Sequence, residues 1–340
     1  MENKPIEVLS TVSFPDQLLE MIHAVSPRLR VSTQLVRRAD EIPAEVWART
    51  EVLYTEMVLP RPGQAPQLRW VQFHYAGVDF LMGSPLLEKP DLIFTTLSGA
   101  AAPQVAEYVV TMLLNLGHHL PDLFTYQSRA EWPRGRWDKF CPLELRGSTV
   151  GIVGYGSIGR EVARLLQPFG VRLLAAKRDV MHPADRGYMA EGLGDPEGNL
   201  FHRLYPIQAL RSMFKECDFV VVALPMTPET QGVIGEEELK ALKPSAYVVD
   251  VGRGGIISQP ALRAALQEQR IAGAALDVFT EEPLPASSPL WKLPNVVITP
   301  HISGFSGQYK ERAVDMFVRN LELYIAGSPL LNQFDPQRNY

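Results

Sequence analysis

Three glycine residues, Gly154, Gly156 and Gly159, stand at the spacing of a phosphate-binding turn. They follow an apolar, strand-like run, open an amphipathic helix and are followed by a second strand-like run. In that context the first glycine makes a tight turn, the second lets the backbone approach a pyrophosphate, and the third lets the helix pack closely on the strand. Ser157 and Ile158, at the start of the helix, add backbone N–H groups and the positive end of the helix dipole. The pattern predicts a dinucleotide cofactor.

The end of the second strand bears on which dinucleotide binds. NAD-binding proteins usually hold a carboxylate there, which accepts hydrogen bonds from the adenosine ribose hydroxyls. Here the run 171–176 is followed by Lys177 and Arg178, and the first acid, Asp179, comes two residues beyond the expected position. Two cations attract a ribose 2′-phosphate, whereas a carboxylate repels it. The pair predicts NADP(H) in preference to NAD(H); the alternative interpretation is a solvated strand end that is basic for no functional reason.

The elements that must position these residues alternate between strands and helices. In the second part of the chain, strands are predicted at 149–154, 171–176, 219–224, 246–251, 273–278 and 296–300, and helices at 157–169, 206–215, 236–242 and 259–269. The first hundred residues have the same rhythm without a glycine fingerprint, with strands predicted at 6–12, 30–36, 51–57, 68–74 and 92–97 and a helix at 16–25. Such alternation is typical of parallel sheets covered by helices. The sequence predicts two doubly wound, Rossmann-like α/β domains.

The predicted domains differ in continuity. A last helix at about 306–326 should fold back on the N-terminal part, so we expect a discontinuous substrate (catalytic) domain made of 1–100 and 305–340. The dinucleotide-binding domain should then span 101–304. Its first segment, 101–120, is apolar on almost every face and is predicted to be a buried helix that serves as a hinge or a homodimer element.

Two connections in the second part are unusually long. The stretch that follows the apolar helix, 121–147, is polar and broken by prolines, and we expect an irregular surface segment. The connection 179–205 lies beside the predicted adenosine site. It has three alternative roles: covering that site, contacting a second subunit, or remaining a mobile loop.

Composition excludes several classes of protein. The 340 residues carry a net charge of −5, so no basic surface for nucleic acid or an anionic membrane is expected. The most apolar runs, such as 219–224, are strand-sized, and the N-terminus lacks a signal pattern, so we expect a cytoplasmic protein. The two cysteines form no disulfide framework, and the histidines complete no metal site.

Several stretches of the chain resemble, in the same order, the D-isomer-specific 2-hydroxyacid dehydrogenases. The resemblance covers nearly the whole chain and is strongest over 145–304. Besides the glycine turn, it rests on YAGVD (75–79), VAEYVV (105–110), ALPMTPETQGVIG (223–235), VVDVGRGGIISQPAL (248–262), ALDVFTEEPLP (275–285) and TPHISG (299–304). The resemblance implies reduction of small 2-keto acids, of the glyoxylate and hydroxypyruvate type, to D-2-hydroxy acids by hydride transfer from NAD(P)H.

The resemblance also implies a catalytic trio. The arginine of VGRGG is Arg253, the acid before Pro283 is Glu282, with the adjacent Glu281 as the alternative, and the histidine of TPHISG is His301. A guanidinium can grip a substrate carboxylate and polarise the keto oxygen. A histidine can donate the proton that the oxygen takes up, and a neighbouring carboxylate favours the imidazolium and orients it.

Further roles follow from the same resemblance. Asp277 is implied as the acceptor for the nicotinamide carboxamide. Residues implied to line the cofactor cleft are Pro225, Thr230 and Val251. Ala76 and Gly77 would offer backbone amides to the substrate carboxylate, and Tyr75 beside them either shapes the pocket or simply packs.

Two other classes of function remain open. Related proteins use this fold as dinucleotide-sensing corepressors, which bind partners and turn over no metabolite. Other relatives oxidise a different small anion, such as formate or phosphite. The fold by itself does not decide among these substrates.

Overall fold

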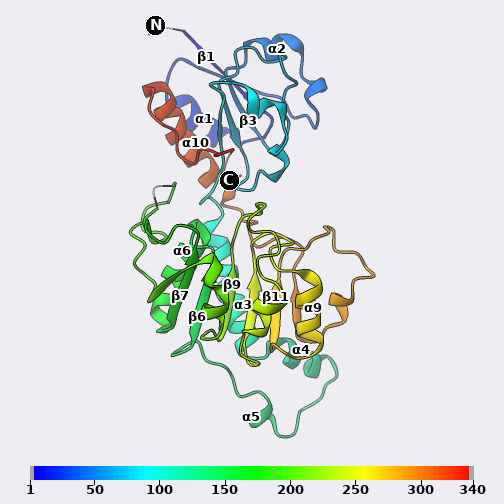
Figure 1. Cartoon of the computed structure of the whole chain (residues 1–340). Helices are drawn as coiled ribbons and strands as arrows, with labels where there is room; N and C mark the ends of the chain where they lie inside the picture. The colour runs from blue at the N-terminus through cyan, green and yellow to red at the C-terminus, as the bar shows by residue number, and fades with distance from the viewer. Residues whose placement is uncertain (1–3, 186, 337–340) are drawn as a thin grey trace. The chain divides into compact units, whose positions relative to one another are not determined.

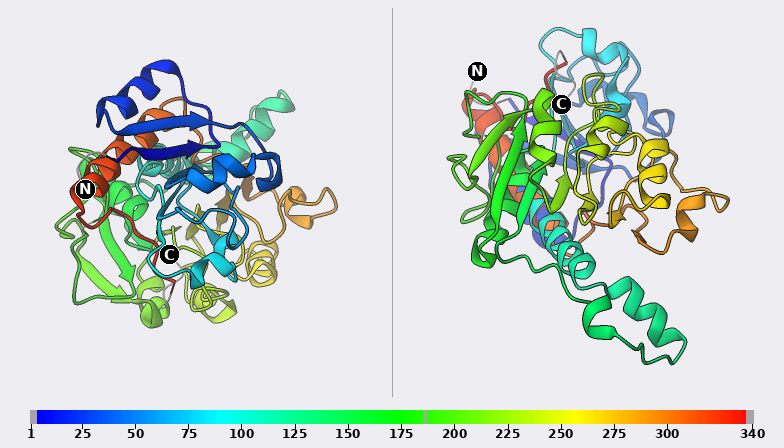
Figure 2. Two further views of the ribbon diagram at one scale, coloured as in Figure 1. Left: turned by 90° about the horizontal axis from the view of Figure 1, so that it is seen from above. Right: turned by 60° about the horizontal axis from the view of Figure 1, so that its bottom comes forward.

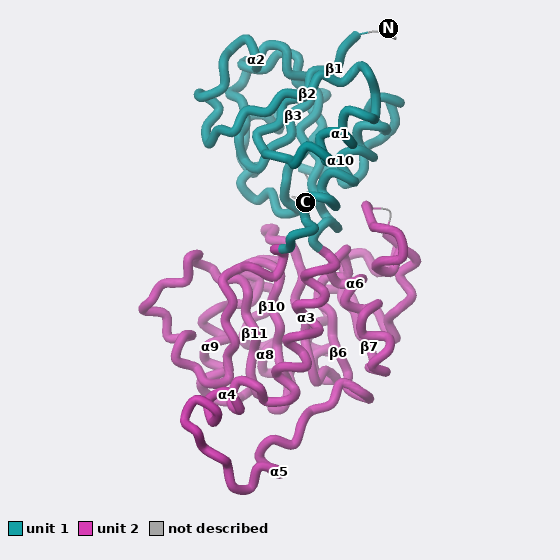
Figure 3. Tube along the Cα trace, turned by 180° about the vertical axis from the view of Figure 1, so that it is seen from behind, with its two compact units in different colours: residues 1–101, 306–340 teal, residues 102–305 magenta. Residues whose placement is uncertain are grey.

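The computed structural model describes residues 4–185 and 187–336, which form two compact units (Figure 1). Unit 1 contains the described residues up to Ala101 and those from Ser306 onward, and unit 2 runs from Ala102 to Phe305 (Figure 3). The chain therefore leaves unit 1 once and returns to it. The predicted arrangement of two parallel α/β domains, the first of them discontinuous, is confirmed.

Unit 1 is built on a five-stranded parallel sheet. The strands lie in the order β2 (Leu29–Thr33), β1 (Ile6–Ser10), β3 (Val52–Thr55), β4 (Trp70–Phe73) and β5 (Ile93–Thr95). Its helices are α1 (Asp16–Ala24), α2 (Ala44–Arg49) and α10 (Tyr309–Ala326). Helix α10 packs on α1, and its buried face joins the apolar core through Val314, Phe317 and Leu321. This apolar packing is what returns the C-terminal segment to unit 1.

Unit 2 is built on a seven-stranded parallel sheet. The strands lie in the order β12 (Val296–Ile298), β11 (Gly273–Leu276), β10 (Tyr247–Asp250), β9 (Phe219–Val222), β6 (Thr149–Val153), β7 (Arg172–Lys177) and β8 (Arg203–Pro206). The order reverses between β6 and β9, which is the switch point where doubly wound sheets bind ligands at the carboxyl ends of their strands. The strands β6, β9, β10 and β11 are buried throughout, as expected for a sheet covered on both faces.

The helices of unit 2 cover this sheet. They are α3 (Ala102–Gly117), α4 (Leu120–Ser128), α5 (Arg136–Lys139), α6 (Ser157–Leu166), α7 (Leu210–Phe214), α8 (Glu236–Lys240) and α9 (Gln259–Gln267). Short 3-10 helices occur in both units at Ala39–Glu41, Asp79–Leu81, Pro85–Glu88, Gln167–Phe169, Ile207–Ala209 and Pro289–Lys292. Helix α3 packs along α6 and against β10 and β11, so its own chain covers most of it.

Two expectations about the connections need correction. The segment 121–147 is not wholly irregular, because it contains most of α4 and all of α5, and these extend away from the sheet of unit 2 (Figure 2). Neither helix has a buried residue, so no apolar period was available to predict it. The connection 179–205 ends in the edge strand β8, whose short RLYP sequence (203–206) carries little strand signal.

Candidate active site and cofactor site

The glycine turn follows β6 and leads directly into α6. Gly154 has a φ of +103°, and a Cβ on it would lie 2.7 Å from the Ala223 carbonyl oxygen. A Cβ on Gly159 would lie 2.2 Å from the Gly154 carbonyl oxygen, whereas a Cβ on Gly156 would meet nothing. The first and third glycines are therefore required by the fold itself. The second leaves open space beside the start of the helix, where backbone N–H groups are available to an anion.

Lys177 at the end of β7 and the following Arg178 have different hydrogen-bond and ion-pair partners. The Lys177 ammonium donates a hydrogen bond of 2.7 Å to the His182 carbonyl oxygen, and burial lowers the pKa of this lysine. Arg178 is more exposed, and its Nη1 lies 3.5 Å from Oε2 of Glu229. The Asp179 carboxylate accepts a hydrogen bond of 2.8 Å from His182 Nδ1 if that nitrogen carries a proton. The first acid after the strand is thus occupied within its own loop.

The histidine and one of the two adjacent glutamates form a pair in unit 2. His301 Nδ1 lies 2.7 Å from Oε2 of Glu282, and both side chains remain partly exposed. The other oxygen of Glu282 accepts a hydrogen bond of 2.9 Å from the Phe279 backbone N–H. The glutamate is therefore held in place by its own loop while it orients the imidazole. Glu282, rather than Glu281, is the acid that contacts the histidine.

Arg253 lies in a glycine turn that packs against the loop of Glu282. A Cβ on Gly254 would lie 1.8 Å from the Phe279 carbonyl oxygen, so only glycine permits this approach of the two loops. The half-buried Arg253 side chain donates a hydrogen bond of 2.9 Å to the Gly252 carbonyl oxygen. All three residues of the expected trio therefore lie on loops that follow neighbouring strands, β10, β11 and β12.

Asp277 organises the segment that carries His301. Its fully buried carboxylate accepts hydrogen bonds from the Thr299 hydroxyl at 2.6 Å and from the Ile302 and Ser303 N–H groups at 3.0 and 2.9 Å. These donors use both carboxylate oxygens. The structure thus gives Asp277 a clear role in holding the histidine turn.

Two further polar residues near this edge of the sheet were not predicted from the sequence: Asp250 at the end of β10, and Tyr108 of α3. Asp250 ends β10, and burial, with the neighbouring charge of Asp277, raises the pKa of its carboxyl to about 7, although the Gly252 N–H partly offsets this. The Tyr108 hydroxyl lies 2.7 Å from the Thr299 hydroxyl, and burial raises the pKa of this tyrosine to about 12. A carboxylate directly after four buried apolar positions was the available signal for Asp250.

The residues expected to line the cofactor cleft lie on turns after β9 and β10. The Thr230 hydroxyl donates a hydrogen bond of 2.7 Å to the Pro225 carbonyl oxygen and so closes the turn between them. Val251 is buried directly after β10. These positions are shaped by local hydrogen bonding and burial.

The expected substrate loop belongs to unit 1 and follows β4. Tyr75 and Ala76 are exposed and Gly77 is half-buried. Burial, together with a hydrogen bond to Glu56, raises the pKa of Tyr75 to about 12, so this phenol stays neutral. His74, before the loop, has its Nδ1 2.7 Å from the Tyr54 hydroxyl, and burial lowers the pKa of this histidine to about 4.

The described residues contain neither a membrane-spanning helix nor a cluster of metal ligands. None of the helices in that part of the chain is long and apolar enough to cross a membrane. Nor do three or more His, Cys, Asp or Glu side chains gather there in an arrangement suited to a metal ion.

The sequence is similar to a known protein family and to individual members of it. The family profile described as "D-isomer specific 2-hydroxyacid dehydrogenase, NAD binding domain" matches residues 110–303. A glyoxylate reductase of Pyrococcus furiosus is 33% identical over 269 residues, covering 77% of this chain and 74% of the relative. A glyoxylate reductase of Thermococcus litoralis is 28% identical over 332 residues, covering 94% of each.

One solved structure has the same fold as this chain over nearly its whole length. The crystal structure of a D-isomer specific 2-hydroxyacid dehydrogenase from Xanthobacter autotrophicus, in complex with NADPH and MES, matches with a TM-score of 0.78 and 28% identity. The match covers 99% of this chain and 100% of that one. Since the profile spans more than half of the 340 residues and the sequence relatives cover most of the chain, this protein belongs to the D-isomer specific 2-hydroxyacid dehydrogenase family.

Proposed function

We propose that this protein reduces small 2-keto acids, of the glyoxylate and hydroxypyruvate type, to D-2-hydroxy acids as a cytoplasmic, NADP(H)-preferring enzyme. The observation that carries the proposal is the pairing of His301 Nδ1 with Glu282 at 2.7 Å, because it leaves Nε2 as the ring nitrogen for proton transfer. The glyoxylate reductase names of the sequence relatives and the NADPH in the Xanthobacter structure support the substrate class and the cofactor.

The residues of unit 2 fit a dinucleotide cofactor. The turn is open beside Gly156, and the start of α6 presents N–H groups, including those of Ser157 and Ile158. Strand β7 ends in Lys177, and Arg178 follows it directly. In the proposal, the glycine turn holds the pyrophosphate, Lys177 and Arg178 hold the ribose 2′-phosphate, and the remaining predicted cleft residues, Pro225, Thr230, Val251 and Asp277, line the nicotinamide half. The bound cofactor supplies the hydride.

The chain's own residues would carry out the remaining steps. In unit 2, Arg253 would bind the substrate carboxylate and polarise the keto oxygen. In unit 1, the backbone amides of Ala76 and Gly77 would serve as donors to a substrate carboxylate, as the family resemblance implies. His301 gives a proton to the keto oxygen as the carbonyl carbon is reduced, and Glu282 keeps the imidazole oriented. Unit 1 is thereby proposed as the substrate domain and unit 2 as the dinucleotide-binding domain.

A steady-state screen tests the proposed reaction. Glyoxylate, hydroxypyruvate, pyruvate and larger keto acids would each be offered with NADPH and with NADH, and consumption of the reduced cofactor would be followed. We expect turnover of glyoxylate and hydroxypyruvate with NADPH, and a D-configured product wherever the product is chiral. Absence of turnover with every keto acid and both cofactors would contradict the proposal.

The cofactor preference is expected to depend most on Arg178. Loss of one charge-assisted contact to the 2′-phosphate costs about 1.5–3 kcal/mol, so Arg178→Ala should lower kcat/KM for NADPH about ten- to a hundredfold and leave NADH kinetics nearly unchanged. Lys177→Ala should act in the same direction. Arg211→Ala is the matched control, because this arginine faces Glu237 at 3.4 Å much as Arg178 faces Glu229. Equal use of both cofactors by the unmodified protein would refute the preference.

We also propose a homodimer, with the contact extended from α3 to the projecting segment 118–147. Trp132 and Trp137 of this segment are 82% and 77% exposed, and the Arg136 guanidinium lies over both rings, at 5.7 and 4.6 Å from their centroids. Exposed aromatic residues with arginine are the side chains most enriched at protein interfaces. A second copy of this chain is the proposed partner.

Analytical ultracentrifugation at micromolar concentration tests the homodimer. We expect about twice the chain mass, and Trp132→Ala with Trp137→Ala should weaken association at least about tenfold, as loss of central aromatic anchors does. Trp291→Ala is the matched control, since Trp291 is 50% exposed elsewhere in unit 2. A monomeric unmodified protein, or unchanged association of the double variant, would argue against this contact.

A further inference from the structure

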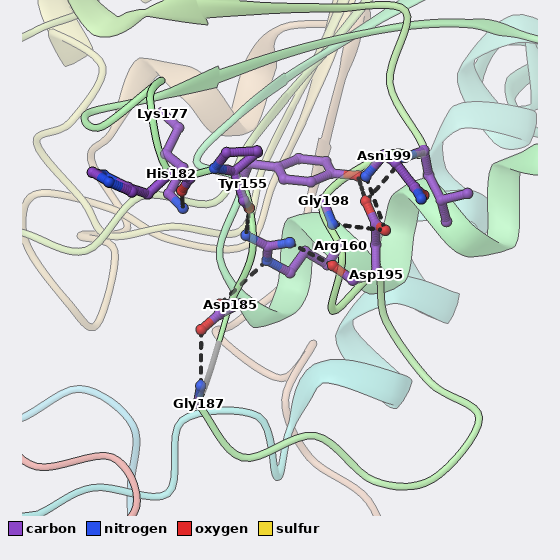
Figure 4. Close-up of polar contacts among 11 residues, drawn as sticks. Tyr155, Arg160, Lys177, His182, Asp185, Gly187, Asp195, Gly198 and Asn199 are labelled. Atoms are coloured by element: carbon purple, nitrogen blue, oxygen red, sulfur yellow. Dashed lines mark hydrogen bonds and ion pairs between the residues drawn. The ribbon is translucent and has the colours of Figure 1, made fainter.

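A fully buried arginine holds the long connection between β7 and β8. Arg160 lies in the first half of α6, and its side chain is inaccessible to solvent. Its guanidinium donates hydrogen bonds to the backbone carbonyl oxygens of Pro183 and Asp195, and its Nε lies 3.2 Å from Oδ2 of Asp185 (Figure 4). A buried charge is retained only where partners of this kind compensate for its lost hydration. The connection is therefore anchored to α6.

Asp195 forms a second buried anchor in the same connection. Its carboxylate accepts a hydrogen bond of 2.6 Å from the Tyr155 hydroxyl. The same carboxylate accepts three backbone N–H bonds at 3.0 to 3.1 Å, from Gly198, Asn199 and Leu200. The Tyr155 ring in turn lies 4.9 Å from the Arg160 guanidinium carbon. These bonds fix the path of the chain as it returns to the sheet (Figure 4).

Further contacts join the first part of the connection, which leaves β7 (the outgoing limb, 179–185), to the second part, which leads to β8 (the returning limb, 187–205). The Asp185 N–H donates to the Pro196 carbonyl oxygen at 2.9 Å, across the gap between the outgoing and the returning limb. The Gly194 N–H donates to the buried Glu161 carboxylate of α6 at 2.6 Å. The described residues of the connection, 179–185 and 187–205, therefore form a folded segment on α6. Of the three roles left open by its length, that of a mobile loop is the least compatible with these contacts.

The anchors belong to the elements that the proposed cofactor site uses. Tyr155 stands between Gly154 and Gly156 in the glycine turn, and Lys177 at the end of β7 donates to the His182 carbonyl oxygen of the connection. In doubly wound folds these two places receive the pyrophosphate and the adenosine ribose. Arg160 cannot itself bind a phosphate in this arrangement, since its side chain is wholly buried and bonded to the connection.

We propose that the Arg160 cluster (Tyr155, Arg160, Asp185 and Asp195) holds the described residues of the connection, 179–185 and 187–205, as a fixed wall beside the adenosine ribose, and thereby determines selectivity for the 2′-phosphate. Arg160 is a positioning residue, acting through the connection on Lys177 and its neighbours. This inference rests on the proposed use of NADP(H). It extends that proposal, because the selectivity would depend on a buried cluster as well as on the cations at the strand end.

The test measures dinucleotide binding directly by isothermal titration calorimetry, without turnover. Asp185→Asn removes the charge facing Arg160, and its side-chain oxygen can still accept the bond from the Gly187 N–H. Glu197→Gln, at an exposed position of the same connection, is the matched control with the same change of net charge. Removing a negative charge near a phosphate should relieve Coulomb repulsion and so strengthen NADPH binding. Loss of the anchor should weaken it, so the two causes have opposite signs.

We expect Asp185→Asn to raise the dissociation constant for NADPH about three- to tenfold and Arg160→Met at least about tenfold, with smaller changes for NADH. Hydrogen exchange of the Gly194 and Gly198–Leu200 amides should accelerate in both variants. Glu197→Gln should match the unmodified protein in both its dissociation constants and its amide exchange. Thermal unfolding would show whether Arg160→Met folds. If it does not, comparison of Asp185→Asn with Glu197→Gln still tests the proposal.

Three outcomes would count against this inference. Faster amide exchange with unchanged NADPH-to-NADH selectivity would show that the connection is anchored but plays no part in cofactor choice. Unchanged exchange in every folded variant would show that the cluster does not hold the connection. NADPH binding strengthened by Asp185→Asn would mean that charge alone governs the site. By contrast, an unmodified protein that binds neither dinucleotide would overturn the proposed function itself.

Discussion

Replacing His301 with alanine should lower kcat for keto-acid reduction about a hundred- to ten-thousandfold, the range usual for loss of a general acid. The expectation follows from the local geometry. Glu282 engages Nδ1 at 2.7 Å and is itself held by the Phe279 N–H, so the ring presents Nε2 in a defined direction. The measurement is steady-state consumption of NADPH with the best keto acid from the substrate screen.

The matched control for this variant is His23→Ala, which removes an exposed histidine of α1 in unit 1. NADPH should still bind to the His301→Ala protein, because the glycine turn and the end of β7 are untouched. Near-normal turnover by His301→Ala would contradict the mechanism. It would mean that a group other than His301 supplies the proton to the keto oxygen.

Replacing Asp250 with asparagine should stabilise the protein above neutral pH. Burial raises the pKa of this carboxyl from its ordinary value of 3.8 to about 7, so the folded state binds the proton more tightly than the unfolded state. The resulting contribution to stability is complete below about pH 4 and is lost as the pH rises through about 7. Asparagine has the shape of the protonated acid and cannot ionise.

The gain should therefore grow with pH. A difference of about three pKa units corresponds to at most about 4 kcal/mol of unfolding free energy at pH 8, and the gain should approach zero near pH 4. Thermal and urea unfolding of both proteins at several pH values would measure it. Asp277→Asn is the informative control: the Asp277 carboxylate accepts three hydrogen bonds, so an amide donor there should destabilise. A less stable Asp250→Asn protein at pH 8 would contradict the assignment of a buried, proton-binding carboxyl.

Both predictions depend on side chains at the carboxyl ends of β10, β11 and β12, and the sequence indicated this edge only in part. The alternation of apolar runs and helical segments predicted the strands, because residues that are buried in a parallel sheet must be apolar whatever lies around them. The glycine turn was also predictable, because its spacing belongs to the strand–turn–helix motif of dinucleotide-binding folds. Within that motif, backbone atoms leave no room for a Cβ on Gly154 or Gly159. Resemblance to a family then supplied Arg253, Glu282 and His301.

Only the tertiary structure decided which of these groups meet. The sequence cannot distinguish Glu281 from Glu282 by type, and the contact with His301 depends on how two loops from neighbouring strands pack. Asp277 likewise receives its hydrogen bonds from residues more than twenty positions away. Such contacts depend on the path of the whole chain, which local residue preferences do not determine.

Arg160 shows the same limit most clearly. In the sequence it is a charged residue on an amphipathic helix, a position that normally faces water. In the structure the long connection 179–205 folds over that face with its described residues. It supplies the two backbone carbonyl oxygens and the Asp185 carboxylate that pair with Arg160. The sequence by itself determined the two parallel-sheet domains and the positions where a dinucleotide and an acid–base pair would fit. The tertiary structure decided which hydrogen bonds and ion pairs hold the side chains at those positions. A hydrogen bond between residues far apart in the chain exists only after the fold has brought them together.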